Sequence, residues 1–445
     1  MRPSLQFTPT KWALIAQVVG RWRRYHWDTL PGRLMVAEIA FVVGALLAGC
    51  LGVYAAVVRA NTTRDIGGHL EPLNASVTTL YRSLADADAT AAAGFLAGGV
   101  EPREVQARYV RDLMTATTNL AQASTQAGGE LVASRRIADI TTQLPVYTGL
   151  VERARANNRD GRPVGVAYLR RASELMQNSI LAEAAELQRR QAAQLDAAYE
   201  RLGPVLVGVV AVGAVSLAGL VWLQVFLFQR TQRVFNIGLV VATVAVLAGT
   251  VWWMAAESVS ANSLASARGH SRSVSDALGP AQIAALQARS VESLELVTRD
   301  AGPTEPDFAA RMQLLERDNG AGGALGAARR FVSDQTGTTL VQAAIDDAGG
   351  YAAAHREVRR LDDVGDYVKA VNAAVNTREP SAATAFDRLD SALTVAVAHE
   401  RDVFQRDIAH AQNWLTGLPI GTGGVALVIA VAVVVGVRQR LEEYR

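Results

Sequence analysis

The most regular feature of the sequence is the alternation of long apolar stretches with long polar segments. Four stretches approach or exceed the roughly 20 apolar residues that a helix needs to cross a bilayer. They carry one charged side chain between them, Glu38, and cover residues 35–58, 205–228, 235–255 and 416–437. The first is longer than the apolar region of a signal peptide. We therefore expect four transmembrane helices and no cleaved leader.

The charges between these stretches predict the orientation of the chain. Three short segments hold eleven Lys and Arg against three Asp and Glu: 1–34, 229–234 and 438–445. The positive-inside rule makes these segments cytoplasmic, as an N-terminal basic segment, a turn and a tail. The two long segments, 59–204 and 256–415, are then extracytoplasmic. The sequence predicts a multi-pass protein of the cell membrane with both termini in the cytoplasm.

Both long segments have the composition of helices, because Ala, Leu, Gln, Glu and Arg dominate and runs of β-branched residues are missing. Glycine and proline divide the first segment into four expected helices, 59–97, 101–127, 130–158 and 164–204. In the second segment we expect about four helices and one extra kink, with breaks at 279–280, 302–303, 320–323, 349–350 and 379–380. Segments that begin and end at the membrane favour an up-down-up-down order. The predicted fold class is an all-α membrane protein with four transmembrane helices and two extracytoplasmic antiparallel four-helix bundles.

The order of span, long segment and span occurs twice, which indicates an internal duplication. Sparse matches support it at a constant offset of 218 residues: Ala167, Tyr168, Arg170, Ser173 and Leu175 correspond to Ala385, Phe386, Arg388, Ser391 and Leu393. The two segments differ in charge, since residues 256–415 carry six more acidic than basic side chains. An acidic surface for a basic partner is one interpretation, and ordinary solvated helical faces are the other.

Motifs for catalysis and cofactor binding are missing from the sequence. It contains no P-loop, GxSxG, HExxH or kinase signature, so we predict no enzyme, no catalytic residue and no cofactor. One cysteine excludes a disulfide framework or a cysteine zinc site, and six scattered histidines predict no metal site. His399 and His410 lie about 16 Å apart by helical rise. A net charge of +2 gives no indication of nucleic-acid binding.

One residue is a weak candidate for ligand binding. Arg64 follows the first span by six residues, and chemoreceptors with similar bundles hold an amino-acid carboxylate with arginines near such positions. No partner-binding residues stand out, but residues 11–24 combine apolar and basic side chains with two tryptophans. This pattern suits an amphipathic helix on the inner face of the lipid bilayer, or a docking helix for a cytoplasmic protein.

This organisation is typical of a sensor that passes its signal to a separate protein, because the tail 438–445 is too short to hold an output domain. Alternatives are a chemoreceptor-like bundle that binds a small ligand directly, a transport accessory and a membrane scaffold. The spans lack the paired charges and broken helices of carriers. Bundles of this kind often dimerise, so a homodimer is one expected state.

Several runs resemble the GlnX family, four-span actinobacterial membrane proteins of the PknG signalling pathway. The similar runs are 144–152, 154–159, 161–169, 365–371 and 385–390. The resemblance implies a GlnH-like solute-binding lipoprotein outside the membrane, which binds aspartate or glutamate. It also implies a PknG-like cytoplasmic Ser/Thr kinase that controls glutamate metabolism. It implies no site residues.

Overall fold

The computed structural model describes residues 30–99, 101–126, 130–203, 206–231, 236–299, 305–378 and 380–442. These residues are almost entirely helical and contain no strand, apart from an isolated bridge between Arg317 and Gly322. The all-α prediction is confirmed. Most of the predicted basic segment, residues 1–29, lies outside the described residues, as do positions 232–235 of the predicted turn and the end of the tail.

The described chain divides into two compact units. Unit 1 takes residues up to Asn61, Leu202–Ala261 and those from Ala411 onward, and unit 2 takes Thr62–Arg201 and Asn262–His410. Both long polar segments of the sequence therefore contribute to one unit. The predicted domain boundaries at 59, 204, 256 and 415 remain predictions.

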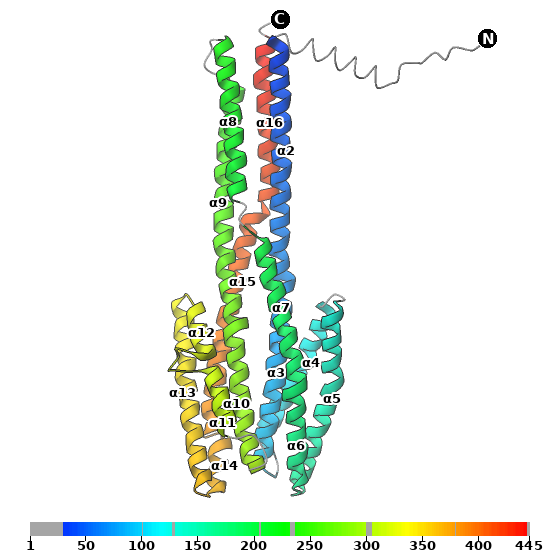
Figure 1. The fold of residues 1–445 in the computed structure, drawn as a ribbon, viewed down its shortest axis with the longest axis vertical. Coiled ribbons are helices and arrows are strands. Elements are labelled where there is room, and N and C mark those ends of the chain that lie inside the picture. The colour runs from blue at the N-terminus through cyan, green and yellow to red at the C-terminus, as the bar shows by residue number, and fades with distance from the viewer. Residues whose placement is uncertain are drawn as a thin grey trace, which may run out of the picture. The chain divides into compact units, whose positions relative to one another are not determined.

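Unit 1 contains the four apolar helices or parts of them: α2 (Leu30–Asp65), α8 (Leu206–Thr231), α9 (Ile237–Ser273) and α16 (Leu418–Glu442) (Figure 1). All four are long and apolar enough to cross a membrane. Large apolar side chains such as Leu51 and Val215 are exposed on them, as expected of surfaces that face lipid. The chain is a multi-pass membrane protein.

Small residues and a few polar contacts hold the helices of unit 1 together. Gly238 lies against α16 so closely that a Cβ atom there would collide with the Ala432 carbonyl oxygen. Beside this contact, the Asn236 side chain donates a hydrogen bond of 2.6 Å to the Gly436 carbonyl. Close backbone approach and interhelical hydrogen bonds are the usual means of packing helices in lipid, where the hydrophobic effect gives no drive for association.

One buried ion pair also belongs to unit 1. The guanidinium of Arg59 lies 2.9 Å from the Glu257 carboxylate and donates a second hydrogen bond to the Leu202 carbonyl at 2.8 Å. Both side chains are buried, so each charge depends on the other for compensation. The pair joins α2 to α9.

In the first segment of unit 2, the helices match the predicted breaks closely. They are α3 (Glu71–Leu96), α4 (Arg103–Gln126), α5 (Leu131–Arg159), α6 (Val164–Leu175) and α7 (Leu181–Arg201). Gly98 and Gly99 end α3 with φ angles of 73° and 51°, a backbone conformation that glycine adopts without steric cost. Gly128 and Gly129, the second predicted break, lie outside the described residues.

The second segment is more divided than expected. Its helices are α10 (Gly279–Thr298), α11 (Glu305–Leu315), α12 (Gly323–Phe331), α13 (Gln335–Asp363), α14 (Tyr367–Val375) and α15 (Ala382–Thr416). The break predicted at 349–350 is wrong, because both glycines lie inside α13. The break at 279–280 is also wrong. There the helix continues through one turn of π-helix, η3 (Val274–Leu278), directly before Pro280, and a π-helical turn accommodates an interruption of the regular hydrogen-bond ladder.

The two segments of unit 2 share a hydrophobic core. Helices α3 and α10 pack side by side (Figure 1), and one cluster of buried side chains joins Leu80 and Met176 of the first segment to Leu286 and Leu389 of the second. Two further single turns of π-helix, η1 (Ile66–Leu70) and η2 (Met176–Ile180), interrupt the long helices of the first segment. The segments expected to form two bundles are thus packed together.

Candidate functional site

An ion network connects the two segments of unit 2. Arg108 of α4 contacts three carboxylates, with nitrogen–oxygen distances of 3.0 Å to Asp86 of α3 and 3.1 Å to both Asp387 and Asp390 of α15. Arg82 of α3 lies 2.9 Å from Asp390. Two of the acidic residues that give the second segment its negative excess are therefore used inside the unit.

Burial and neighbouring charges shift the pKa values of the groups in and beside this network. Burial by itself lowers the pKa of Arg108, but the charges of Asp86, Asp390 and Asp387 outweigh it and raise the pKa above its usual value. For Asp112, one turn further along α4, the surroundings disfavour the charged form instead. Burial and the charge of Asp86 raise its pKa to about 8, although Arg108 lowers it. One oxygen of Asp112 is buried without a hydrogen bond.

Asp112→Asn is expected to reduce the loss of stability at alkaline pH. The raised pKa means that the folded state holds the Asp112 proton more tightly than the unfolded state, so stability falls as pH rises from about 4 to about 8. We expect the variant to be more stable at pH 8 by about 1–3 kcal/mol, a figure reduced for the partial exposure of the side chain. Thermal unfolding of the detergent-solubilised chain at pH 5 and pH 8 measures the difference. The same decline in both proteins would contradict the assignment, and the exposed Asp139→Asn is the control.

A second acidic group, Asp88 of α3, is fully buried. Its Oδ2 atom accepts hydrogen bonds from Ser173 at 2.9 Å, Gln177 at 2.9 Å and Ser290 at 3.1 Å. Burial raises the pKa of Asp88, and the three donors oppose that shift. The donors come from α6, η2 and α10, so both segments position this carboxylate.

These three donors also line a pocket of about 330 Å³. The rest of its wall combines charged and amide side chains with the apolar Val291 and Leu294, and includes Arg170, Glu174, Asn178, Gln287, Asp307 and Arg311. Cations and anions at the wall, with a buried carboxylate behind it, suit a small zwitterion. Arginine pairs well with a carboxylate, and Glu174 and Asp307 suit an ammonium group.

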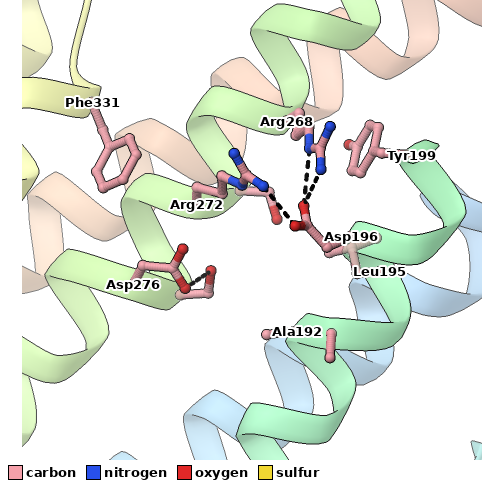
Figure 2. Close-up of a pocket in the computed structure, with 11 residues that line it drawn as sticks. Ala192, Leu195, Asp196, Tyr199, Arg268, Arg272, Asp276 and Phe331 are labelled. Atoms are coloured by element: carbon pink, nitrogen blue, oxygen red, sulfur yellow. Dashed lines mark hydrogen bonds and ion pairs between the residues drawn. The ribbon is translucent and has the colours of Figure 1, made fainter. Parts of the chain in front are cut away.

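Another pocket, of about 260 Å³, lies between α7 and α9 (Figure 2). Arg268 and Arg272 of α9 both point toward Asp196 of α7, at 2.8 Å and 2.6 Å. Against the effect of burial, the hydrogen bonds from Arg272 and Arg268 lower the pKa of Asp196. The pocket beside Asp88 is the larger of these two and adjoins a buried carboxylate, so it is the stronger candidate for a ligand site.

The second segment has a buried cluster of its own around Glu292 of α10. His355 of α13 places its Nδ1 atom 2.8 Å from Glu292 and its Nε2 atom 2.9 Å from Glu305. Glu292 also pairs with Arg289 and accepts a hydrogen bond of 3.2 Å from the Tyr351 hydroxyl. Phe308 stacks on the His355 ring with centroids 3.4 Å apart. The cluster holds together α10, α11 and α13.

The residue singled out from the sequence does not lie at these sites. Arg64 is exposed on α2 and lines neither pocket, and its role in ligand binding stays a prediction. Asp86 and Asp88 were not predicted as functional residues from the sequence. Their signal is compositional, since they are the two charged residues in the alanine-rich run 85–94 of a helix.

The comparison with known proteins assigns the first segment of unit 2. Residues 62–200 match a family model described as an actinobacterial sensor domain. No curated protein and no solved structure matches the chain. The sensor-domain match covers less than a third of the 445 residues, and its limits nearly coincide with Thr62 and Arg201, the ends of the first segment in unit 2. It supports a sensor role, and it contains Asp86, Asp88 and Arg108.

Proposed function

We propose that the protein is a non-enzymatic transmembrane sensor that couples a GlnH-like, aspartate- or glutamate-binding lipoprotein outside the membrane to a PknG-like Ser/Thr kinase in the cytoplasm. The observation that carries the proposal is the sensor-domain match in a chain with four membrane-length helices. The basic short segments support cytoplasmic termini and two extracytoplasmic segments. The resemblance to the GlnX family supports the identity of the two partners.

Three continuous helical stretches supply a physical route for the signal. Met35–Leu96, Ile237–Thr298 and Ala382–Gln439 each contribute residues to both units. A shift or rotation of such a helix in unit 2 is transmitted along its hydrogen-bonded backbone. Two states that differ by a few kcal/mol are enough for a switch of this kind.

The test follows phosphorylation of the kinase's regulator in cells given external glutamate or aspartate. We expect the response to disappear when the protein is deleted and to return with the wild-type chain. An unchanged response in the deletion strain would contradict the coupling role. In that case a scaffold or a transport accessory would be the better assignment.

A variant in α9 tests the helical route within this experiment. Asn262 is exposed at the boundary between the units, and Asn262→Pro removes a backbone hydrogen bond and kinks the helix at a cost of about 3 kcal/mol. We expect membrane insertion without a response. Asn262→Ala keeps the helix and should respond as the wild type does, and a full response from the proline variant would argue against transmission through α9.

The pocket beside Asp88 favours a second candidate function, direct binding of a small amino acid by unit 2. Titration calorimetry of the full chain in detergent with aspartate and glutamate separates this function from the first. Binding that weakens at least tenfold in Arg311→Ala would assign the pocket. No heat with either amino acid would leave the lipoprotein as the source of the signal.

A further inference from the structure

Three side chains of metal-ligating type meet between the start of α13 and α15. Asp334 caps the N-terminus of α13, and its Oδ1 atom accepts a hydrogen bond of 2.8 Å from the Gly337 amide. His399 and Glu400 project from α15. One ligand atom from each of the three residues lies within 4.8 Å of the other two.

Two carboxylate oxygens in this group lack a partner. Glu400 is 1% exposed, and its Oε1 atom accepts no hydrogen bond; the same is true of the buried Oδ2 atom of Asp334. Both oxygens border the same space beside Gly337. A Cβ atom built on Gly337 would lie 3.0 Å from Asp334 Oδ2 and 3.1 Å from Glu400 Oε1. Leaving a charged oxygen buried and unpaired is expensive. A cation between the two oxygens removes that cost.

The remaining atoms of these residues are held in place. His270 of α9 contacts Glu400 Oε2 at 2.8 Å, so Oε1 is left as the oxygen available for a ligand bond. His399 Nε2 lies 3.1 Å from Asp334 Oδ1. Hydrogen bonds that fix the orientation of ligating carboxylates and imidazoles are a regular feature of metal sites.

We propose that Asp334, His399 and Glu400 bind a divalent transition-metal ion of the Zn²⁺ type. One imidazole nitrogen and two carboxylate oxygens are ligands that zinc accepts, whereas Ca²⁺ and Mg²⁺ prefer oxygen alone. Three protein ligands leave a fourth position for water, and Asp334 and His399 are open enough to solvent to admit it. The ion would clamp the start of α13 to α15.

A second group, Glu295, Glu305 and His355, meets the same distance criterion. It is a poorer candidate, because both ring nitrogens of His355 are already engaged by Glu292 and Glu305. The imidazole has no nitrogen left to bind an ion.

The test measures zinc bound to the full chain, purified through a tag without histidine, stripped with a chelator and dialysed against micromolar Zn²⁺. We expect one zinc per chain by elemental analysis, and a visible absorption band when Co²⁺ replaces Zn²⁺. His399→Ala is the decisive variant, because its side chain is partly exposed and it is the least disruptive of the three to remove. We expect its affinity for zinc to fall about 100-fold or more, since even outer-shell changes cost 10–100-fold.

Two further variants complete the test. Gly337→Ala places a methyl group against both unpaired oxygens and should also abolish binding. His410→Ala removes an exposed histidine on the same helix and should leave the stoichiometry at one. Circular dichroism confirms that each variant is folded. Wild-type protein without zinc, or full zinc binding by folded His399→Ala, would overturn the proposal.

Discussion

Glu292→Gln is expected to lower the free energy of unfolding by about 3–5 kcal/mol, the usual cost of leaving buried charges unpaired. Glu292 is 1% exposed and compensates two cationic groups, Arg289 and His355. The amide keeps the shape of the carboxylate but loses its charge. Arg289, also buried, then keeps the Ala374 carbonyl at 3.0 Å, the face of Phe386 and the weaker attraction of the Asp387 charge.

The pH of the measurement matters for this variant. Burial tends to raise the pKa of Glu292, but the charge of Arg289 and the hydrogen bond from His355 outweigh it and lower the pKa. The carboxylate therefore contributes stability above its unfolded pKa and loses it as pH falls through the folded pKa. Thermal unfolding at pH 7 should show the full effect. Glu357→Gln removes an exposed ion pair with Arg360 on α13 and should change nothing measurable. Equal stability of the two variants would contradict the role given to Glu292.

Arg108→Ala is expected to cost about 3 kcal/mol, the lower end of the range for a broken buried pair, because its side chain is 28% exposed. Its removal leaves Asp86 and Asp390 close together, with Arg82 to compensate them. Asp387, which is exposed, loses less. The variant should therefore weaken the packing of the two segments against each other.

Comparison with Arg108→Lys distinguishes charge from geometry. An ammonium group is a single point charge and does not reproduce the fork that reaches three carboxylates, so lysine should recover only part of the stability. Arg103→Ala, at an exposed position of the same helix, serves as the control. Thermal unfolding in detergent and limited proteolysis within the two segments provide two readouts. Wild-type values for Arg108→Ala would exclude the network as a link between the segments.

The helices of the first segment could be predicted because their limits depend on local chemistry. Gly98 and Gly99 end a helix through their own backbone angles, and no distant residue is needed to decide this. Prediction from glycine and proline positions failed where tertiary packing decides whether a helix continues. Gly349 and Gly350 stay helical because the opposite face of α13 is packed against the rest of the unit. Pro280 is accommodated by the π-helical turn η3 that precedes it.

The sites could not be predicted for a different reason. Asp88 obtains its donors from Ser173 and Ser290, and Arg108 obtains its carboxylates from α15. Helical periodicity describes one element at a time and gives no information about which elements meet. The charge excess of residues 256–415 was visible in the sequence, but its partial use against Arg82 and Arg108 depends on the packing of the two segments.

The ion network also has a consequence for the biosynthesis of the chain. Arg108 and Asp387 are separated by 279 residues, and synthesis at about 5–20 residues per second needs roughly 15–55 s to cover that distance. During this interval the first segment exists without the carboxylates of α15, and until Thr298 has been made it also lacks the α10 surface that completes its core. Slow codons or a chaperone that acts during this interval would therefore change the yield of folded protein. The same codons or chaperone acting after residue 390 has been made would change it less.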